Sequence, residues 1–143
     1  MSPGAPELPA EVRQEQSRRV TKTFGTESEK LALHWIHQVM STLPAPVDES
    51  QADLLTRVWP AIEGIAPQDE IEGMLAVQII AVHNVALNQL HRAAHADQSR
   101  VSGQAAADNA AKLLGVFREQ LQALQSYRGK GQQKVTVEHA ERE

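Results

Sequence analysis

A repeat of small and apolar residues in the last third of the chain constrains its fold most strongly. The repeat alternates steps of four and three residues, which is the spacing of a coiled-coil seam on one face of a helix. It predicts a helix over about 103–128, with small residues in its first half and large ones in its second. The repeat comprises Gly103, Ala107, Ala110, Leu114, Phe117, Leu121 and Leu124.

A second long helix is expected over about 67–96. Pro67 with the acidic residues Asp69 and Glu70 behind it is typical of a helix start, because the helix dipole favours acidic side chains there. Its apolar residues spread over more than one face, which predicts contacts on several sides. Only a short polar stretch separates the two long helices, so we expect a long antiparallel hairpin.

Two shorter helices should pack against this hairpin, over about 27–43 and 48–59. Thr26 and Glu29 have the spacing of a capping box, in which each side chain accepts from a free backbone N–H of the other. Pro60 is expected to kink or end the second short helix, because proline lacks the N–H that a helix interior requires.

The sequence divides into three parts. Residues 1–20 are expected to be a flexible tail with at most a marginal helix over 12–20, and residues 21–128 a helical domain. Residues 129–143 are expected to be a basic loop and a strand-like tail, because β-branched residues alternate within 132–139. Such a strand requires a partner strand.

Composition supports an all-α fold. Apolar residues make up 41% of the chain but aromatic residues only 3%, so the core must be aliphatic, which suits packed helices. The chain has no cysteine, which excludes disulfides, thiolate zinc sites and cysteine nucleophiles. Its net charge of −4 argues against a globally basic nucleic-acid binder.

Two stretches carry a resemblance to a known family. PQDEIEGMLAVQIIAVHNVALNQLHRA (67–93) and LQALQSYRGKGQQKVTVEH (121–139) resemble a family of uncharacterised small helical proteobacterial proteins, in which a long hairpin ends in an RxGxGQQKVTVEHV-type segment. The resemblance covers about the second half of the chain. It implies a helical architecture and carries over no catalytic residues.

The histidines are the candidate metal ligands. His34 and His37 lie one turn apart, and His91 and His95 are spaced i, i+4, so each pair shares a helix face, as metal sites require. No helix carries the Glu-x-x-His pattern of carboxylate-bridged bundles, and His91 and His95 fall on a polar face. We therefore expect solvated histidines and no metal or other cofactor. His83 should be half-buried and hydrogen-bonded to a neighbour.

The end of the chain holds the most concentrated positive charge. Arg128, Lys130 and Lys134 are interspersed with glycines, whose open backbone N–H groups favour phosphate. The same residues also suit a helix C-terminus whose cations complement the dipole. With Val135 and Val137 of the predicted strand, they form the expected interaction segment.

No catalytic or nucleotide-binding signature occurs in the sequence, so we expect no enzyme. No apolar run reaches the length that spans a bilayer, so we expect a cytoplasmic protein without membrane contact. The favoured interpretation is a non-enzymatic helical interaction or oligomerisation module, an adaptor or assembly protein that binds its own copies or another protein. The alternative is a nucleic-acid-associated accessory protein of phage or mobile-element type that uses the basic C-terminal segment.

Overall fold

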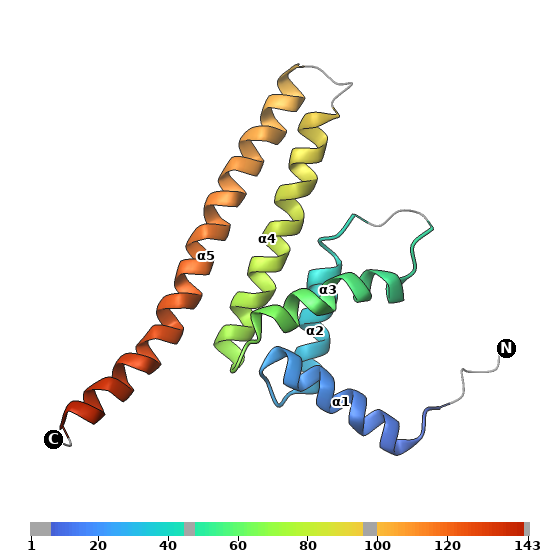
Figure 1. Ribbon diagram of the computed structural model, residues 1–143. Coiled ribbons are helices and arrows are strands. Elements are labelled where there is room, and N and C mark those ends of the chain that lie inside the picture. The colour runs from blue at the N-terminus through green and yellow to red at the C-terminus, as the bar shows by residue number, and fades with distance from the viewer. Residues whose placement is uncertain (1–6, 45–47, 96–99, 142–143) are drawn as a thin grey trace.

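The described chain consists of five helices (Figure 1). The computed structural model describes residues 7–44, 48–95 and 100–141, with side chains as far as residue 130. The fold is all-helical, as predicted, and these residues contain no strand. The helices are α1 Ala10–Phe24, α2 Glu29–Met40, α3 Gln51–Ile65, α4 Glu70–Ala94 and α5 Arg100–Glu141.

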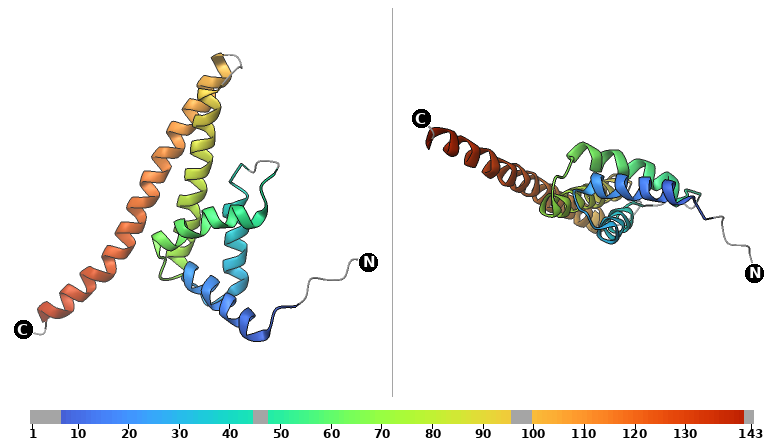
Figure 2. Two further views of the ribbon diagram at one scale, coloured as in Figure 1. Left: turned by 45° about the vertical axis from the view of Figure 1, so that its right-hand side comes forward. Right: turned by 90° about the horizontal axis from the view of Figure 1, so that it is seen from below.

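Helix α4 is the central element of the fold. The cluster of α1, α2 and α3 lies beside its N-terminal half, and α5 packs closely along another side in the opposite direction (Figures 1 and 2). The tip of the α4–α5 pair extends well beyond the three-helix cluster. Part of the turn predicted between the long helices, residues 97–99, lies outside the described residues.

The hydrophobic core lies where α1, α2, α3 and α4 meet. Phe24, Val39 and Ile62 are fully buried there. The Phe24 and Trp35 rings pack with centroids 5.9 Å apart at a tilted angle, an arrangement that aromatic pairs favour. The remainder of the core is aliphatic, as the composition predicts.

Two glycines permit unusually close approaches around this core. A Cβ at Gly73 of α4 would lie 2.6 Å from the Phe24 carbonyl oxygen and 2.6 Å from the Trp35 ring. Gly25 ends α1 with a positive φ of 69°, and a Cβ there would lie 2.6 Å from the Pro67 carbonyl oxygen. These contacts hold α1, the loop after it and the start of α4 together.

The predicted capping box at Thr26 and Glu29 is wrong. Ser28 is the N-cap of α2, and its Oγ accepts a hydrogen bond from the Leu31 N–H at 3.2 Å. The Thr26 hydroxyl instead accepts from the Ser28 N–H and donates to Glu70 at the start of α4. The reason is tertiary: Thr26 is buried, so its hydroxyl bonds across the fold.

Helix α3 does not end at residue 59 as predicted. It continues to Ile65 and ends at Ala66, which has a positive φ of 53°. Leu54, Val58 and Ile62 are spaced by four residues and all are buried. A proline inside a helix costs about 3 kcal/mol, but burying Ile62 recovers about 1.5–3 kcal/mol, and Pro60 itself is exposed.

The N-terminal part of the chain also differs from expectation. Residues 1–6 of the predicted tail lie outside the described residues. Residues 10–24 form a helix that includes the marginal one expected over 12–20 and extends it at both ends. Val20 packs against the core and Phe24 lies within it. Burial of this last turn anchors a helix that is otherwise exposed. The residues of this stretch alone do not show that its end packs into the core.

The strand predicted over 132–139 is not formed. These residues continue α5 as helix through Gly129 and Gly131 to Glu141. A strand needs a second strand for its backbone hydrogen bonds, whereas a helix satisfies its own within the segment. The described residues provide no strand to pair with, so the helix is favoured.

The tight packing at Gly73 leads to a first prediction. Gly73→Ala should lower the free energy of unfolding by roughly 1–3 kcal/mol, because the new Cβ overpacks against backbone and ring. Gly115→Ala is the matched control, since a Cβ on this helical glycine meets nothing within 4 Å. It should raise stability by about 0.5–1 kcal/mol through helix propensity. Urea unfolding measures both, and equal effects would contradict the close approach.

Candidate interaction surface on the helical hairpin

Arg128 joins α5 to the start of α4. Its Nε donates to Oε1 of Glu72, and its Nη2 donates to the Ile65 carbonyl at 2.6 Å and to the Ala66 carbonyl at 3.2 Å. Glu72 is only 5% exposed, so its carboxylate requires a partner of opposite charge. Arg128, a member of the predicted interaction segment, makes these contacts within the chain, and its side chain stays 39% exposed.

A second contact lies beside this ion pair. The Tyr127 hydroxyl donates to Oδ2 of Asp69 at 2.6 Å, while Oδ1 accepts from the Glu72 N–H as the N-cap of α4. The hydrogen bond from Tyr127 lowers the pKa of Asp69, and the same bond raises the pKa of Tyr127. At neutral pH the Asp69 carboxylate is therefore ionised and the Tyr127 hydroxyl is protonated, as this hydrogen bond requires.

The structure says little about the other residues of the predicted interaction segment. Lys130 is exposed on α5, and the side chains of Lys134, Val135 and Val137 lie outside the described ones. Glu72 neutralises one of the three cations on which the nucleic-acid alternative was based. That alternative stays a prediction from sequence.

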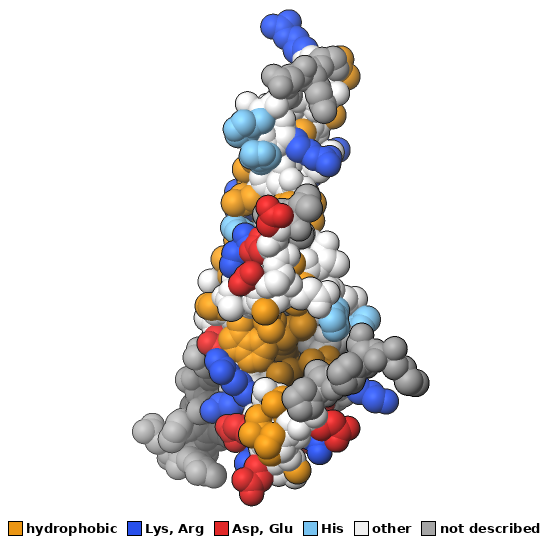
Figure 3. Space-filling view, turned by 90° about the vertical axis from the view of Figure 1, so that its right-hand side faces the viewer, with side chains coloured by type: hydrophobic (Ala, Val, Ile, Leu, Met, Phe, Trp, Pro, Cys, Tyr) orange, Lys and Arg blue, Asp and Glu red, His pale blue; other side chains and the backbone are white. Residues whose placement is uncertain are grey.

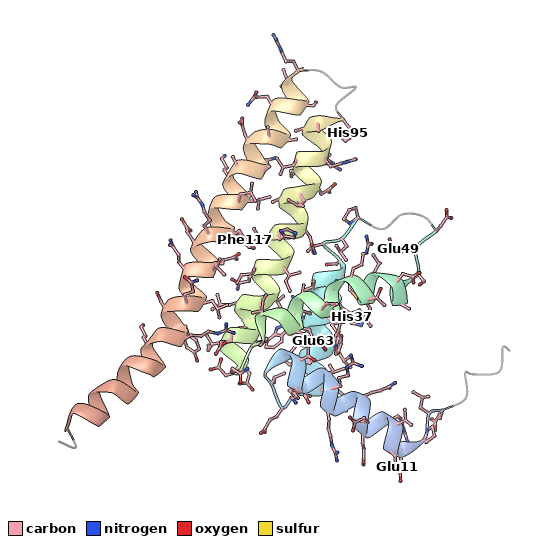
Figure 4. The ribbon with its side chains drawn as sticks, in the orientation of Figure 1. Glu11, His37, Glu49, Glu63, His95 and Phe117 are labelled. Atoms are coloured by element: carbon pink, nitrogen blue, oxygen red, sulfur yellow. The ribbon has the colours of Figure 1, made fainter. Side chains whose placement is uncertain are left out.

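The two histidine pairs are not brought together. His34 and His37 are exposed on α2, whereas His91 and His95 are exposed near the hairpin tip (Figure 4). The rings of His91 and His95 stack with centroids 4.2 Å apart, and His95 Nδ1 lies 3.0 Å from the His91 carbonyl oxygen. The described residues contain no group of three or more His, Asp or Glu arranged to hold a metal.

A wide cleft of about 1060 Å³ opens between the end of α1 and the α3–α4 connection. Arg18, Arg19 and Lys22 line one part of it, but carboxylates including Glu63 and Glu70 line the rest. Charges of both signs cancel at short range, so the cleft does not favour an anion such as phosphate.

An apolar groove of about 410 Å³ lies among α3, α4 and α5. It contains no carboxylate or hydroxyl group, and its polar members are one histidine, one asparagine and one arginine. The arginine is already paired, since Arg57 Nη2 lies 2.6 Å from Glu49 Oε2. The groove is lined by Leu43, Arg57, Val58, Ala61, Ile65, Ile79, Ile80, His83, Asn84, Phe117 and Leu121.

A stripe of large side chains continues from the groove towards the hairpin tip. Spacings of three and four residues place its members on one face of each long helix. His83, predicted to be half-buried, is exposed, and its ring lies 6.2 Å from that of Phe117, so the two helix faces lie side by side (Figure 4). This leucine stripe comprises His83, Leu87 and Leu90 on α4 and Leu114, Phe117 and Leu121 on α5.

The leucine stripe is more exposed than a helix seam should be. Leu87 is 47% exposed, Leu90 41% and Leu114 37%. By contrast, the small residues Ala106 and Ala110 of α5 are buried. Only some residues of the seam predicted over 103–124 are therefore buried, because two helices in contact cover only a narrow strip of each other.

Another apolar area lies on the opposite side of the three-helix cluster. Figure 3 shows hydrophobic side chains gathered over α1 and α3 between charged ones, where Val20, Leu55 and Trp59 line a shallow hollow. The Arg19 guanidinium lies 5.5 Å from the centre of the Trp59 ring, and the indole N–H bonds to Glu63. The Trp59 ring and its N–H thus already have partners within the chain, whereas the leucine stripe contains only apolar side chains and His83.

Known proteins provide no assignment for these features. No protein-family model, curated protein or solved structure matches this chain. Helix α4 is long and apolar enough to cross a membrane, the one such helix in the part described. Core helices of soluble proteins meet the same criterion, and α4 packs against α2, α3 and α5, so it gives no argument for a membrane.

Sequence reasoning missed the two features that matter most at this surface. Leu87 and Leu90 follow the helical period, so their pattern resembles that of core residues. Glu72 and Ala76, one turn apart on α4, are both buried, and nothing in the local sequence distinguishes this carboxylate from the exposed acidic residue Glu70 beside it. Which cation it meets depends on how the hairpin closes.

The ion pair generates a second prediction. Arg128→Ala should lower the free energy of unfolding by about 1–3 kcal/mol, because it leaves the buried Glu72 carboxylate without its cation. Adding Glu72→Gln should recover part of this loss, since a neutral amide is less costly to bury. Lys130→Ala, which removes an exposed cation two residues on, should change stability by less than about 0.5 kcal/mol. Three equal urea midpoints would show that the pair contributes nothing.

A third prediction concerns pH and uses Tyr127→Phe. The pKa of Asp69 is lower in the folded chain than its ordinary 3.8, so its stabilising effect is present above that value and is lost as pH falls through the folded pKa. The stability difference between wild type and Tyr127→Phe should therefore be larger at about pH 7 than at about pH 3. Urea unfolding at both pH values measures it, and a difference that does not shrink in acid would refute the assignment.

Proposed function

We propose that this chain is a non-enzymatic helical interaction module that binds a second copy or another helical protein through the leucine stripe. The supporting observation is the exposure of Leu87, Leu90 and Leu114 on one face of the projecting hairpin. Single exposed leucines are ordinary, but a continuous stripe beside an apolar groove is typical of a protein-binding surface.

The position of the stripe supports a binding role. The three-helix cluster covers α4 in its N-terminal half. Just past the middle of α4, Asn84 donates to Thr42 Oγ1 in the segment after α2, and the buried residues of α4 end at Ala86. Beyond that point the hairpin is a layer of two helices (Figures 1 and 2). Two helices cannot enclose a core, whereas three or four can.

The energetics favour a partner made of apolar side chains. Burying a leucine completely is worth about 1.5–3 kcal/mol, and these leucines have roughly half of that still to gain. The stripe contains no Lys, Arg, Asp or Glu, so covering it desolvates no charge. A groove without carboxylate or hydroxyl groups is better suited to binding a protein than to catalysing a reaction.

A fourth prediction tests this function. The double variant Leu87→Glu/Leu90→Glu should fold like the wild type, because both side chains are exposed, but it should lose every partner that the stripe holds. Light scattering measures self-association against the 15.7 kDa monomer. Affinity capture from a lysate of the source organism measures binding to other proteins. Far-UV circular dichroism and urea unfolding verify the fold.

The matched control is Leu33→Glu, which places the same charge on an exposed leucine of α2 away from the hairpin. It should leave binding intact. A wild-type chain that stays monomeric and retains no protein, or a double variant that binds as well as the control, would exclude the leucine stripe as a binding surface.

A further inference from the structure

The two histidines near the hairpin tip are close enough to act together. His91 and His95 are four residues apart at the end of α4, and their rings stack with centroids 4.2 Å apart. Figure 4 shows His95 at the far end of the hairpin, away from the three-helix cluster. Both side chains are exposed, so an ion in solution can reach them.

A hydrogen bond fixes which nitrogen of His95 is free. Its Nδ1 lies 3.0 Å from the His91 carbonyl oxygen. A carbonyl oxygen only accepts hydrogen bonds, so Nδ1 carries the proton and the lone pair of the neutral ring lies on Nε2. Histidines that bind metals show the same arrangement, because a backbone carbonyl that accepts from one ring nitrogen orients the other as a ligand.

The His91 ring supplies the second nitrogen. Two nitrogens bound to one ion at about 2.1 Å lie roughly 3 Å apart when they occupy neighbouring positions. The rings are stacked in the structure, and a rotamer change of the exposed His91 turns one of its nitrogens towards Nε2 of His95. Because both rings stand on one helix, the second ligand binds intramolecularly, which raises the affinity above that of a single imidazole.

We propose that His91 and His95 bind one divalent transition-metal ion of the Ni²⁺, Cu²⁺ and Zn²⁺ class at the hairpin tip. Imidazole nitrogen suits these ions, whereas Mg²⁺ and Ca²⁺ require oxygen ligands. The described residues offer no third His, Asp or Glu to the site, which leaves the other coordination positions to water. The site makes no use of the leucine stripe and is independent of the proposed function.

The other histidine pair provides an internal comparison. His34 and His37 are also exposed and share one face of α2 at a spacing of three residues. Within the described residues, stacked histidine rings and a hydrogen bond from a ring nitrogen to a backbone carbonyl are found at His91 and His95 and not at this pair. Spacing alone does not separate the two pairs, but these contacts predict tighter binding at the tip.

Calorimetric titration of the untagged full chain with Ni²⁺ tests the proposal. We expect one ion to bind per chain, and His91→Ala and His95→Ala each to weaken the affinity about tenfold or more, because only one imidazole then remains. The matched control is His34→Ala/His37→Ala, which should change the affinity less than about twofold. Titration with Mg²⁺ should give no binding, and circular dichroism verifies the fold of each variant.

NMR of the histidine rings gives a second test. Long-range ¹H–¹⁵N spectra should show His95 with its proton on Nδ1, and small amounts of paramagnetic Cu²⁺ should broaden the ring signals of His91 and His95 before those of His34 and His37. A proton on Nε2 of His95 would overturn the proposal. So would an affinity that the two single variants leave unchanged, or that the control variant lowers as much.

The strength of binding decides the remaining outcome. A Kd for Ni²⁺ in the micromolar range supports the site, whereas binding only at about millimolar Ni²⁺ would mean an adventitious ion only and overturn it. Either result leaves the proposed function unaffected, because that function is measured on the leucine variants.

Discussion

The close packing of α4 at Gly73 is the contact on which the described arrangement depends. At this residue the α4 backbone approaches the Phe24 carbonyl and the Trp35 ring so closely that no side chain fits between them. Helices α1, α2 and α4 therefore meet at a single turn. The neighbouring Glu72 lies about 100° away around the helix, so the same turn also presents a carboxylate to α5.

The position of α5 follows from this turn. Arg128 and Tyr127 bind Glu72 and Asp69 at the start of α4, which anchors α5 beside the three-helix cluster. Nearer the tip, Ala106 and Ala110 allow close contact of the helices because their side chains are small. An ion pair at one end and small residues at the other hold the hairpin together, but they leave its larger side chains only partly covered.

Particular residues show how far the sequence could predict this result. The apolar repeat of α5 predicts the helix and its direction of burial, and Leu124 is indeed buried, but Leu121 of the same repeat is 40% exposed. Spacing shows which residues share a face, but it does not show how wide a strip the neighbouring helix covers. Likewise Arg128 is a visible cation in the sequence, whereas its carboxylate lies 56 residues away and is found only when the hairpin closes.

The sequence by itself determined what local physics controls: the all-helical fold, the two long helices and the aliphatic character of the core. These depend on side-chain periodicity and on composition, both of which are properties of short stretches. Tertiary structure decided the passage of α3 through Pro60, the anchoring of α1 by Phe24, the partner of Arg128 and the exposure of Leu87 and Leu90. Each of these depends on contacts between segments far apart in the chain, which the residue pattern of a short stretch does not show.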